Sequence, residues 1–467
     1  MHPPARNPIA RSRPRVAIVG SGIAGLAAAW SLRAHADLTL FEAGSHFGGH
    51  VHTIDACVDG TVHPVDTGFL VLNRRTYPGL LGLFAELNIP LAESDMSFSV
   101  QQPLAGGRLE WSGANLDSVF AQRSNLLRPR FWFMLRDILR FNREATALAE
   151  AGCDPGRDAR SVGDFLRQGG YGEAFTQWYF LPMAACIWSC PTEQMLAFPL
   201  ATMVRFCHNH GLLQVRDRPQ WLTVRGGARQ YVQRIVERLP DTRLNTPVRR
   251  IKRFDVGVEV STDAGTEWFD HVVLACHSDQ ALALLADPSE AERSVLGAIG
   301  YQPNRALLHT DASLLPRNTK AWAAWNYESA GARAHGAPAL ATAQAAVAQP
   351  QAQPAVCLHY LVNKLQPVPF QQPVIVSMNP LREPEPASVL REMTYAHPVF
   401  DAAAMAAQSR VPELQGRQRT YYCGAWCGYG FHEDGLKAGY AAAQALLGQV
   451  QKHVHGSLQT ALEAQPR

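Results

Sequence analysis

The stretch Arg15-Val-Ala-Ile-Val-Gly-Ser-Gly-Ile-Ala-Gly25 decides the fold of this chain. The β-branched run from Arg15 to Val19 predicts a buried strand, and the run Leu26 to Leu32 after the glycines is rich in helix formers. A second short strand, Leu38 to Phe41, ends at Glu42. Strand, glycine-rich turn, helix, strand and acid in this order predict a βαβ unit that binds a dinucleotide.

Each residue of this unit has a physical role at a dinucleotide. Gly20 allows the tight turn, Gly22 lets the backbone approach a pyrophosphate, and Gly25 lets the helix pack on the strand. The helix N-terminus offers unpaired N–H groups and a positive dipole end to phosphates. Glu42, 22 residues after Gly20, would accept hydrogen bonds from ribose hydroxyls. The residues expected at this site are Gly20, Ser21, Gly22, Ile23, Ala24, Gly25, Glu42 and Ala43.

Further glycines indicate which dinucleotide is bound. Gly48-Gly49-His50 follows Glu42 after five residues and resembles the second motif of the superfamily of amine oxidases, phytoene desaturases and protoporphyrinogen oxidase. Asp66-Thr-Gly-Phe69 resembles the segment of that superfamily whose backbone lies near the isoalloxazine ring. More narrowly, Asp66–Asn73, Pro182–Ser189 and Gly428–Gly435 resemble a bacterial branch of predicted NAD/FAD-binding oxidoreductases. By this resemblance the cofactor is FAD.

The C-terminal part of the chain carries the matching flavin motif. Cys423-Gly424 follows a short strand, and Gly430-Phe-His-Glu-Asp-Gly435 leads into an Ala-rich helix expected from about Gly435 to Leu447. The N–H groups at the start of that helix would stabilise an anionic reduced flavin. Thr246 to Ile251 resembles the strand whose valine packs on adenine. The resemblance assigns to FAD the residues Gly48, Gly49, His50, Gly68, Phe69, Val248, Gly424, Glu433, Asp434, Gly435 and Leu436.

The order of elements predicts an α/β fold. We expect a doubly wound (Rossmann-like) FAD-binding domain with an inserted α+β substrate domain. The FAD-binding domain is assigned residues 15–76, 221–285 and 415–450, and the substrate domain 77–220 and 286–414. Residues 77–220 look mainly helical, and residues 243–275 look like a small meander of strands. The Ala/Gln/Pro-rich stretch 329–355 is expected to be a surface insertion, and 1–14 and 451–467 are expected to be tails.

Composition limits the classes of function. The 467 residues are 47% hydrophobic and 18% charged with a net charge of +3, which predicts a large core and argues against nucleic-acid binding. No apolar run reaches the ~18 residues of a membrane span. The nine cysteines form no CxxC pair, and the wider spacings of Cys186/Cys190 and Cys423/Cys427 lead us to expect reduced thiols and no metal site. These features favour a cytoplasmic enzyme.

The substrate half departs from amine oxidases. Those enzymes usually hold a water against flavin N5 with a lysine, and the corresponding strand here has Asn304 or Arg305 at that position. We therefore expect an oxidoreductase, a desaturase or dehydrogenase of an apolar, fatty-acyl or isoprenoid-like substrate, with hydride transfer to flavin N5 and an unassigned electron acceptor. The alternatives are an amine oxidase with a modified pocket and a non-catalytic FAD-binding scaffold. No catalytic residue is assigned. The pocket candidates are Trp188, Trp426, Tyr429, Phe431 and His432, and plain core packing is the alternative for each aromatic.

Residues 123–143 combine six arginines with one acid. Arg136, Arg140 and Arg143 share one helical face by their spacing. The opposing apolar stripe consists of Phe131, Met134, Leu135, Ile138 and Phe141. A basic amphipathic helix with aromatic residues can lie at an anionic lipid surface, so one interpretation is peripheral contact with the inner membrane. The other is that the stripe joins the core of the substrate domain.

Overall fold

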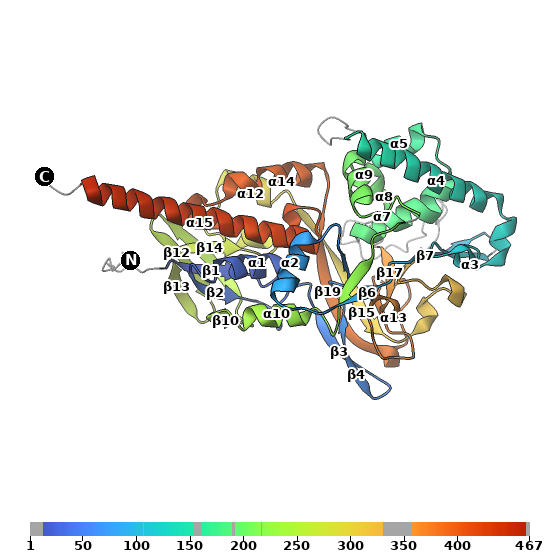
Figure 1. The fold of residues 1–467 in the computed structure, drawn as a ribbon, viewed down its shortest axis with the longest axis horizontal. Coiled ribbons are helices and arrows are strands. Elements are labelled where there is room, and N and C mark those ends of the chain that lie inside the picture. Colours follow the sequence, from blue (N-terminus) through green and yellow to red (C-terminus); the bar gives the residue numbers. More distant parts are fainter. Residues whose placement is uncertain are drawn as a thin grey trace, which may run out of the picture. The chain divides into compact units, whose positions relative to one another are not determined.

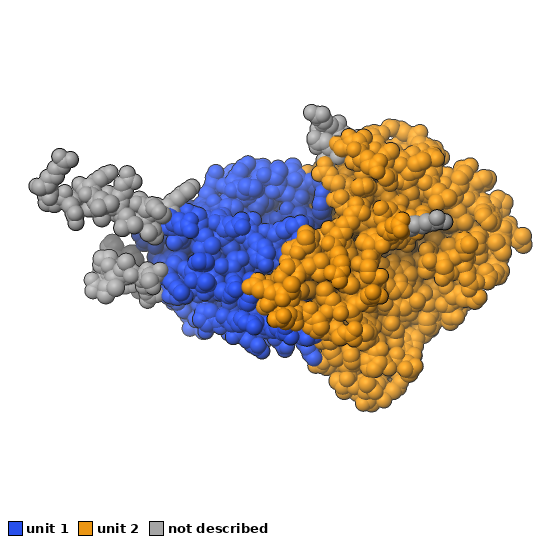
Figure 2. Space-filling view, in the orientation of Figure 1, with its two compact units in different colours: residues 1–52, 229–300, 403–467 blue, residues 53–228, 301–402 orange. Residues whose placement is uncertain are grey.

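The computed structural model describes residues 13–105, 107–152, 160–188, 192–215, 217–329 and 356–463. The chain divides into two compact units. Unit 1 consists of residues 1–52, 229–300 and 403–467, and unit 2 of residues 53–228 and 301–402 (Figure 2). Nearly all of the expected insertion at 329–355, and most of the expected tail at 1–14, lie outside the described residues.

The centre of unit 1 is a parallel sheet. Its described strands follow the order β10 (Asp241–Arg243), β2 (Asp37–Phe41), β1 (Arg15–Val19), β14 (His271–Leu274) and β20 (Thr420–Tyr422). Strands β1 and β14 are apolar throughout their centres because helices and loops bury both faces of a parallel sheet. This is the α/β sheet that the βαβ motif predicts, and it joins segments from both ends and the middle of the sequence.

The remaining elements of unit 1 surround this sheet. The expected meander is present as β11 (Val248–Phe254), β12 (Gly257–Thr262) and β13 (Gly265–Phe269), paired antiparallel. The helices are α1 (Ile23–Leu32), α10 (Arg229–Val236), α11 (Ser278–Leu284), α12 (Glu290–Leu296), α14 (Ala402–Leu414) and α15 (His432–Glu463). Helix α15 begins three residues before the expected start at Gly435 and continues through the segment 451–463 that was expected to be a tail.

Helices α1 and α15 pack directly against each other (Figure 1). A Cβ on Gly435 would lie 2.7 Å from Ile23 Cγ2, and a Cβ on Gly439 would lie 2.1 Å from the Ala24 carbonyl oxygen. Because the contact moves forward along both helices together, the two helices run parallel. Their N-termini therefore lie at the same end of the pair, and only glycine leaves room for this close approach.

Unit 2 is built on a mixed sheet. Its described strands follow the order β19 (Val389–Val399), β15 (Gly300–His309), β18 (Ile375–Met378), β17 (Cys357–Leu361), β16 (Trp325–Glu328), β7 (Phe98–Leu104) and β8 (Gly107–Ser112). Two smaller sheets consist of β3 (Thr53–Val58) with β4 (Thr61–Asp66), and of β5 (Leu72–Asn73), β9 (Trp221–Val224) and β6 (Leu91–Ser94). The flanks of the Ala/Gln/Pro-rich stretch are strands, as expected.

The helices of unit 2 are α2 (Pro78–Glu86), α3 (Leu116–Val119), α4 (Pro129–Glu150), α5 (Val162–Gln168), α6 (Glu173–Phe175), α7 (Leu181–Trp188), α8 (Thr192–Ala197), α9 (Leu200–Asn209) and α13 (Val362–Leu365). The expectation of a mainly helical segment at 77–220 is wrong for β6, β7 and β8. These strands form because β7 pairs with β16, far away in sequence, and β6 pairs with β9.

The boundaries of the units differ from the expected domain limits. Residues 53–76 and 221–228, expected in the FAD-binding domain, belong to unit 2. They form β3, β4, β5 and β9, whose pairing partners all lie within that unit. Hydrogen-bonded pairing, rather than proximity in sequence to the glycine motif, therefore decides to which unit these strands belong.

Candidate dinucleotide site

The glycine turn between β1 and α1 has a backbone that side chains would obstruct. Gly20 has a φ of +102°, and a Cβ on it would lie 2.9 Å from the Ala275 carbonyl oxygen. A Cβ on Gly25 would lie 2.0 Å from the Gly20 carbonyl oxygen. At Gly22, by contrast, no described atom lies within 4 Å of the Cβ position. The turn thus presents open backbone at Gly22, where a pyrophosphate could approach the N-terminus of α1.

Glu42 ties this turn to the second glycine motif. One carboxylate oxygen accepts hydrogen bonds from the Ser21 N–H (3.0 Å) and the Ser21 hydroxyl, and the other accepts from the Gly44 N–H (2.7 Å). The Ser21 hydroxyl in turn accepts from the Gly48 N–H at 3.0 Å. Each oxygen of the carboxylate can accept more than one hydrogen bond, so Glu42 keeps the capacity to accept ribose hydroxyls.

The Gly48–Gly49 pair lies directly on the first turn. Both residues have positive φ, +119° and +60°, and a Cβ on Gly49 would lie 3.2 Å from the Gly22 Cα. The segment that leads to Val248 lies beside the chain at Glu42, because the Thr246 N–H donates a hydrogen bond to the Glu42 carbonyl oxygen at 2.8 Å. The predicted residues of unit 1 from both halves of the motif are therefore brought together.

The N-terminus of α15 is held by Asp434. Its carboxylate accepts from the N–H groups of Tyr429 (3.1 Å) and Phe431 (3.0 Å). Burial raises the pKa of Asp434 to about 6, although these two hydrogen bonds oppose the shift. His432 Nε2 lies 2.7 Å from the Tyr231 hydroxyl, and burial lowers the pKa of His432 to about 3. The imidazole is therefore neutral at physiological pH, and His432 adds no positive charge at the start of the helix.

The predicted residues Gly68 and Phe69 belong to unit 2, where the segment is anchored by Asp66. The Asp66 carboxylate accepts from the Ala228 N–H at 2.9 and 3.0 Å, and the Gln366 side chain bonds both the Asp66 N–H and its carbonyl oxygen. The Thr67 hydroxyl lies 2.7 Å from that of Tyr395. These contacts fix the backbone of the segment within its own unit.

The pocket candidates fall into two groups. Trp426 is buried in unit 1 with its indole N–H donating to the Cys276 carbonyl oxygen at 3.1 Å. Trp188 is buried in unit 2 with its ring 5.0 and 4.7 Å from the rings of Phe198 and Phe206. Both tryptophans are thus packed aromatics. The other three candidates, Tyr429, Phe431 and His432, are half-buried on the loop and first turn of α15.

The two residues expected at the position of the amine-oxidase lysine, Asn304 and Arg305, have different surroundings. Asn304 is fully buried; its side chain accepts from Asn379 Nδ2 at 2.8 Å and has its own Nδ2 3.0 Å from His397 Nδ1. Arg305 points outward and pairs with Glu383 and Glu392. His397, and Tyr231 beside His432, carry no local sequence signal, because each reaches its partner from a separate element.

Comparison with known proteins identifies the family. Residues 23–361 match the family model described as flavin containing amine oxidoreductase. The chain belongs to this family. FAD is the cofactor of the flavin-containing amine oxidoreductases, as expected for this chain. The open backbone at Gly22 and the glycine-lined contact with Gly49 fit such a group.

Relatives in this family differ in their substrates. The chain is 29% identical over 318 residues to the carotenoid phi-ring synthase of Streptomyces griseus, across 64% of this chain and 58% of that protein. It is 28% identical over 287 residues to a Mycobacterium tuberculosis protein named as a flavin-containing monoamine oxidase, across 58% of this chain and 59% of that protein. The chain therefore spans less than two thirds of the length of these curated relatives.

Solved structures confirm the expected fold class. A fatty acid isomerase from P. acnes has a TM-score of 0.62 at 16% identity and covers 93% of this chain and 99% of its own. Cyclohexylamine oxidase from Brevibacterium oxydans has a TM-score of 0.64 at 16% identity, covering 94% and 100%. At these identities the similarity shows the fold alone. Within the described residues, no helix combines the length and apolar character needed to cross a bilayer.

Proposed function

We propose that the protein is an FAD-dependent desaturase or dehydrogenase of an apolar, fatty-acyl or isoprenoid-like substrate. The observation that carries this proposal is Asn304, a neutral, buried amide on β15 at one of the two positions expected to correspond to the lysine of amine oxidases. Its polar atoms are engaged by Asn379 and His397, and a neutral amide does not supply the ammonium group with which a lysine holds a water. The carotenoid phi-ring synthase among the curated relatives is named for an apolar compound, which supports the same class.

In this proposal the cofactor is held mainly by backbone. The N-terminus of α1 and the glycines before it bind the pyrophosphate, Glu42 accepts from the ribose, and the N-terminus of α15 faces the flavin. FAD, when bound, supplies a hydride acceptor at flavin N5. The chain contributes the orientation of the substrate and an environment that excludes water. The residues proposed to bind FAD are Gly20, Ser21, Gly22, Ile23, Ala24, Gly25, Glu42, Ala43, Gly48, Gly49, His50, Gly68, Phe69, Val248, Gly424, Glu433, Asp434, Gly435 and Leu436.

The proposal is tested by anaerobic reduction of the purified flavoprotein. We expect a fatty-acyl or isoprenoid compound from a lipid panel to bleach the flavin absorbance, whereas polyamines and aromatic amines leave it unchanged. Bleaching by amines, with peroxide released when oxygen is admitted, would instead identify the amine oxidase alternative. A flavin that neither panel bleaches, but that dithionite reduces, would leave the non-catalytic scaffold as the correct description.

We also propose that the protein touches anionic membranes through the region around α4. The predicted stripe itself packs inward, since Phe131, Met134 and Phe141 are buried, so the interpretation that it joins the core of unit 2 is correct for these residues. A different apolar set is exposed nearby: Leu126 (44%), Leu127 (86%), Trp132 (48%), Phe133 (54%) and Leu139 (59%). Exposed arginines accompany it, which is the chemistry of an interfacial helix.

Vesicle co-sedimentation tests the membrane contact. We expect binding to vesicles with anionic phospholipid and loss of that binding in the double variant Leu127→Ser/Trp132→Ser. The matched control is Val256→Ser, which removes an equally exposed apolar side chain (65%) from unit 1. Absence of sedimentation by the unaltered protein, or equal binding by all three proteins, would overturn this proposal without affecting the one on the substrate.

A further inference from the structure

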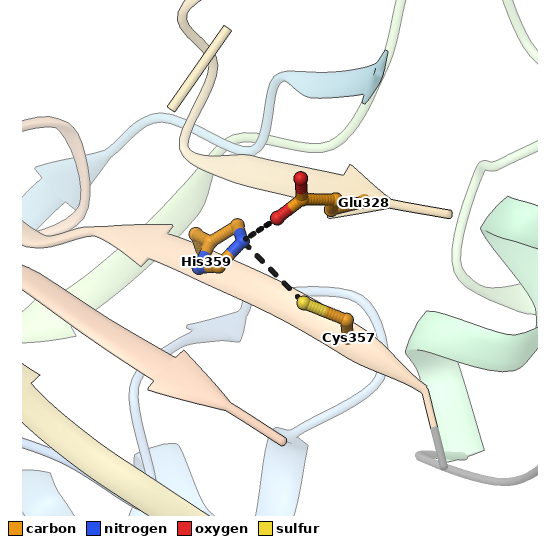
Figure 3. A group of neighbouring side chains, drawn as sticks. All are labelled: Glu328, Cys357 and His359. Atoms are coloured by element: carbon orange, nitrogen blue, oxygen red, sulfur yellow. Dashed lines mark hydrogen bonds and ion pairs between the residues drawn. The ribbon is translucent and has the colours of Figure 1, made fainter. Parts of the chain in front are cut away.

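Unit 2 contains a buried group of three metal-ligating side chains that the flavin chemistry does not use. Glu328, Cys357 and His359 lie together on β16 and β17, and all three are buried (Figure 3). His359 Nε2 lies 3.1 Å from Glu328 Oε2 and 3.4 Å from Cys357 Sγ. The three donor atoms lie within 4.8 Å of one another. A carboxylate, a thiol and an imidazole thus converge on one point in the interior.

The pairing of the strands explains why these side chains meet. Cys357 and His359 are two residues apart on β17, so their side chains leave the same face of the sheet. Glu328 stands directly opposite Cys357 in the antiparallel pair of β16 and β17, and directly opposite residues also share a face. The arrangement is therefore a property of the sheet and does not depend on a flexible loop.

We propose that Glu328, Cys357 and His359 bind one Zn²⁺ ion. Zinc takes tetrahedral sets of thiolate, imidazole and carboxylate at bond lengths of about 2.0–2.3 Å, which puts neighbouring donor atoms roughly 3.3–3.8 Å apart. The observed separations of 3.1 and 3.4 Å need a change of only a few tenths of an ångström. Three protein donors leave the fourth position to water.

The surrounding groups orient the donors as an outer shell of a metal site does. The Ser377 hydroxyl lies 2.6 Å from His359 Nδ1, on the side of the ring away from the other two donors, and 2.7 Å from His309 Nε2. Arg108 and Arg382 approach the other oxygen of the Glu328 carboxylate, Oε1, at 3.5 and 3.4 Å. Partners on the far atoms of His359 and Glu328 fix the orientation of these two ligands and leave their inner atoms for the metal.

The charge of the donors and their chemical type favour zinc over calcium and magnesium. A thiolate and a carboxylate together neutralise a divalent ion, which lowers the cost of burying it. Calcium and magnesium take oxygen donors, whereas thiolate and imidazole suit zinc. The ion would connect β16 to β17 at Glu328 and Cys357, the facing ends of the two strands.

Metal analysis of the whole flavoprotein tests the proposal. The protein is stripped with a chelator, dialysed, and titrated with Zn²⁺ alone and with Co²⁺, whose thiolate complexes give a strong charge-transfer absorption. We expect one ion per chain, a cobalt–thiolate band, and at least a 100-fold loss of affinity in Cys357→Ser and in His359→Gln. The control Cys207→Ser alters another buried cysteine of unit 2 and should bind the metal as the unaltered chain does.

The outcomes distinguish a metal site from a hydrogen-bonded core cluster. Failure of the unaltered protein to retain one ion, or equal binding in all variants, would overturn the proposal. If the variants do not fold, the unaltered protein still decides the question. Zn²⁺ should protect Cys357 from alkylation during brief partial denaturation, as read by mass spectrometry, and lack of both protection and the cobalt–thiolate band would also overturn it. The result is independent of the substrate of the enzyme.

Discussion

The glycine-lined region of unit 1 and the Glu328–Cys357–His359 cluster of unit 2 are two different kinds of binding surface. The first exposes backbone N–H groups, helix N-termini and the open position at Gly22, and its carboxylates Glu42 and Asp434 mostly hold the backbone in shape. The second consists of buried side-chain atoms on a rigid sheet. A backbone site is sensitive to added atoms, whereas a side-chain site is sensitive to removed ones. The predictions below test this difference.

The largest effect is expected from adding one carbon to the turn. Gly25→Ala places a Cβ 2.0 Å from the Gly20 carbonyl oxygen, far inside van der Waals contact, so we expect a loss of about 5 kcal/mol of stability and of all bound FAD. The matched variant Gly22→Ala meets no described atom and should fold while losing FAD. Thermal denaturation and the flavin-to-protein absorbance ratio measure both. Equal melting temperatures for the two variants would contradict the argument.

In unit 2, removal of atoms is the sensitive change. His359→Leu removes the imidazole partner of the buried Glu328 carboxylate and one of the two imidazole partners of the Ser377 hydroxyl, which should cost about 2–3 kcal/mol even in chelator-treated protein. Denaturant unfolding measures the loss. The FAD content should stay that of the unaltered protein, and a loss of flavin together with stability would show that the two regions are not independent.

Glu42 is expected to act on cofactor affinity more than on the fold. Glu42→Gln keeps one acceptor oxygen but cannot accept from Ser21 and Gly44 on opposite oxygens, so we expect FAD to bind about 10- to 100-fold more weakly. Titration of apoprotein with FAD, followed by flavin fluorescence, gives the affinity. The control Glu86→Gln alters an exposed acid on α2 and should leave the affinity unchanged.

Asp434 predicts a dependence of stability on pH. Its folded pKa of about 6 lies above the unfolded value of about 3.9, so its ionisation destabilises the fold as the pH rises from 4 through 6. In apoprotein, the stability of Asp434→Asn relative to that of the unaltered protein should therefore be greater at pH 7 than at pH 4. The difference between the two pH values should be about 1–2 kcal/mol, since the side chain is partly exposed. Melting curves of both proteins between pH 4 and 7 provide the comparison; a difference that does not change with pH would refute the assignment.

The smallest effect is expected where side chains meet in water. Arg249 and Asp263 form an ion pair at 2.8 Å, yet both are well exposed, at 60% and 66%. Arg249→Ala should change the free energy of unfolding by less than about 0.5 kcal/mol. A larger loss, measured by denaturant unfolding at physiological salt, would mean that geometry alone and not burial decides the strength of such contacts here.

The βαβ unit could be predicted because its determinants are local. The run Arg15 to Glu42 carries strand, turn and helix preferences that agree with one another, and the structure follows them. Helix α15 begins three residues before its predicted start. The Asp434 side chain, in the first turn of the helix, accepts a hydrogen bond from the loop before it, and helix propensity does not reveal this contact. Strands β6 to β8 were missed because their partners β9 and β16 lie far away along the chain.

The same reason explains why the sequence led us to expect no metal site. Cysteine spacing is the local sign of a metal site. The cluster instead combines Cys357 and His359 with Glu328, which lies 29 residues before Cys357 and is brought opposite it by the pairing of the two strands. Register is fixed by tertiary pairing, so the convergence of these side chains becomes visible only in the folded sheet. The conformation of the glycine motifs, by contrast, can be predicted from their local sequence.

The contact of Gly439 with Ala24 has a consequence for how the protein is made. Helix α1 is synthesised long before α15, against which it packs, and the edge strand β20 also lies far along the sequence. The contact between the two helices therefore forms only after α15 has been synthesised, and a nascent chain that stalls before β20 holds an unfinished nucleotide fold. Quality-control proteases would find such interrupted chains unprotected.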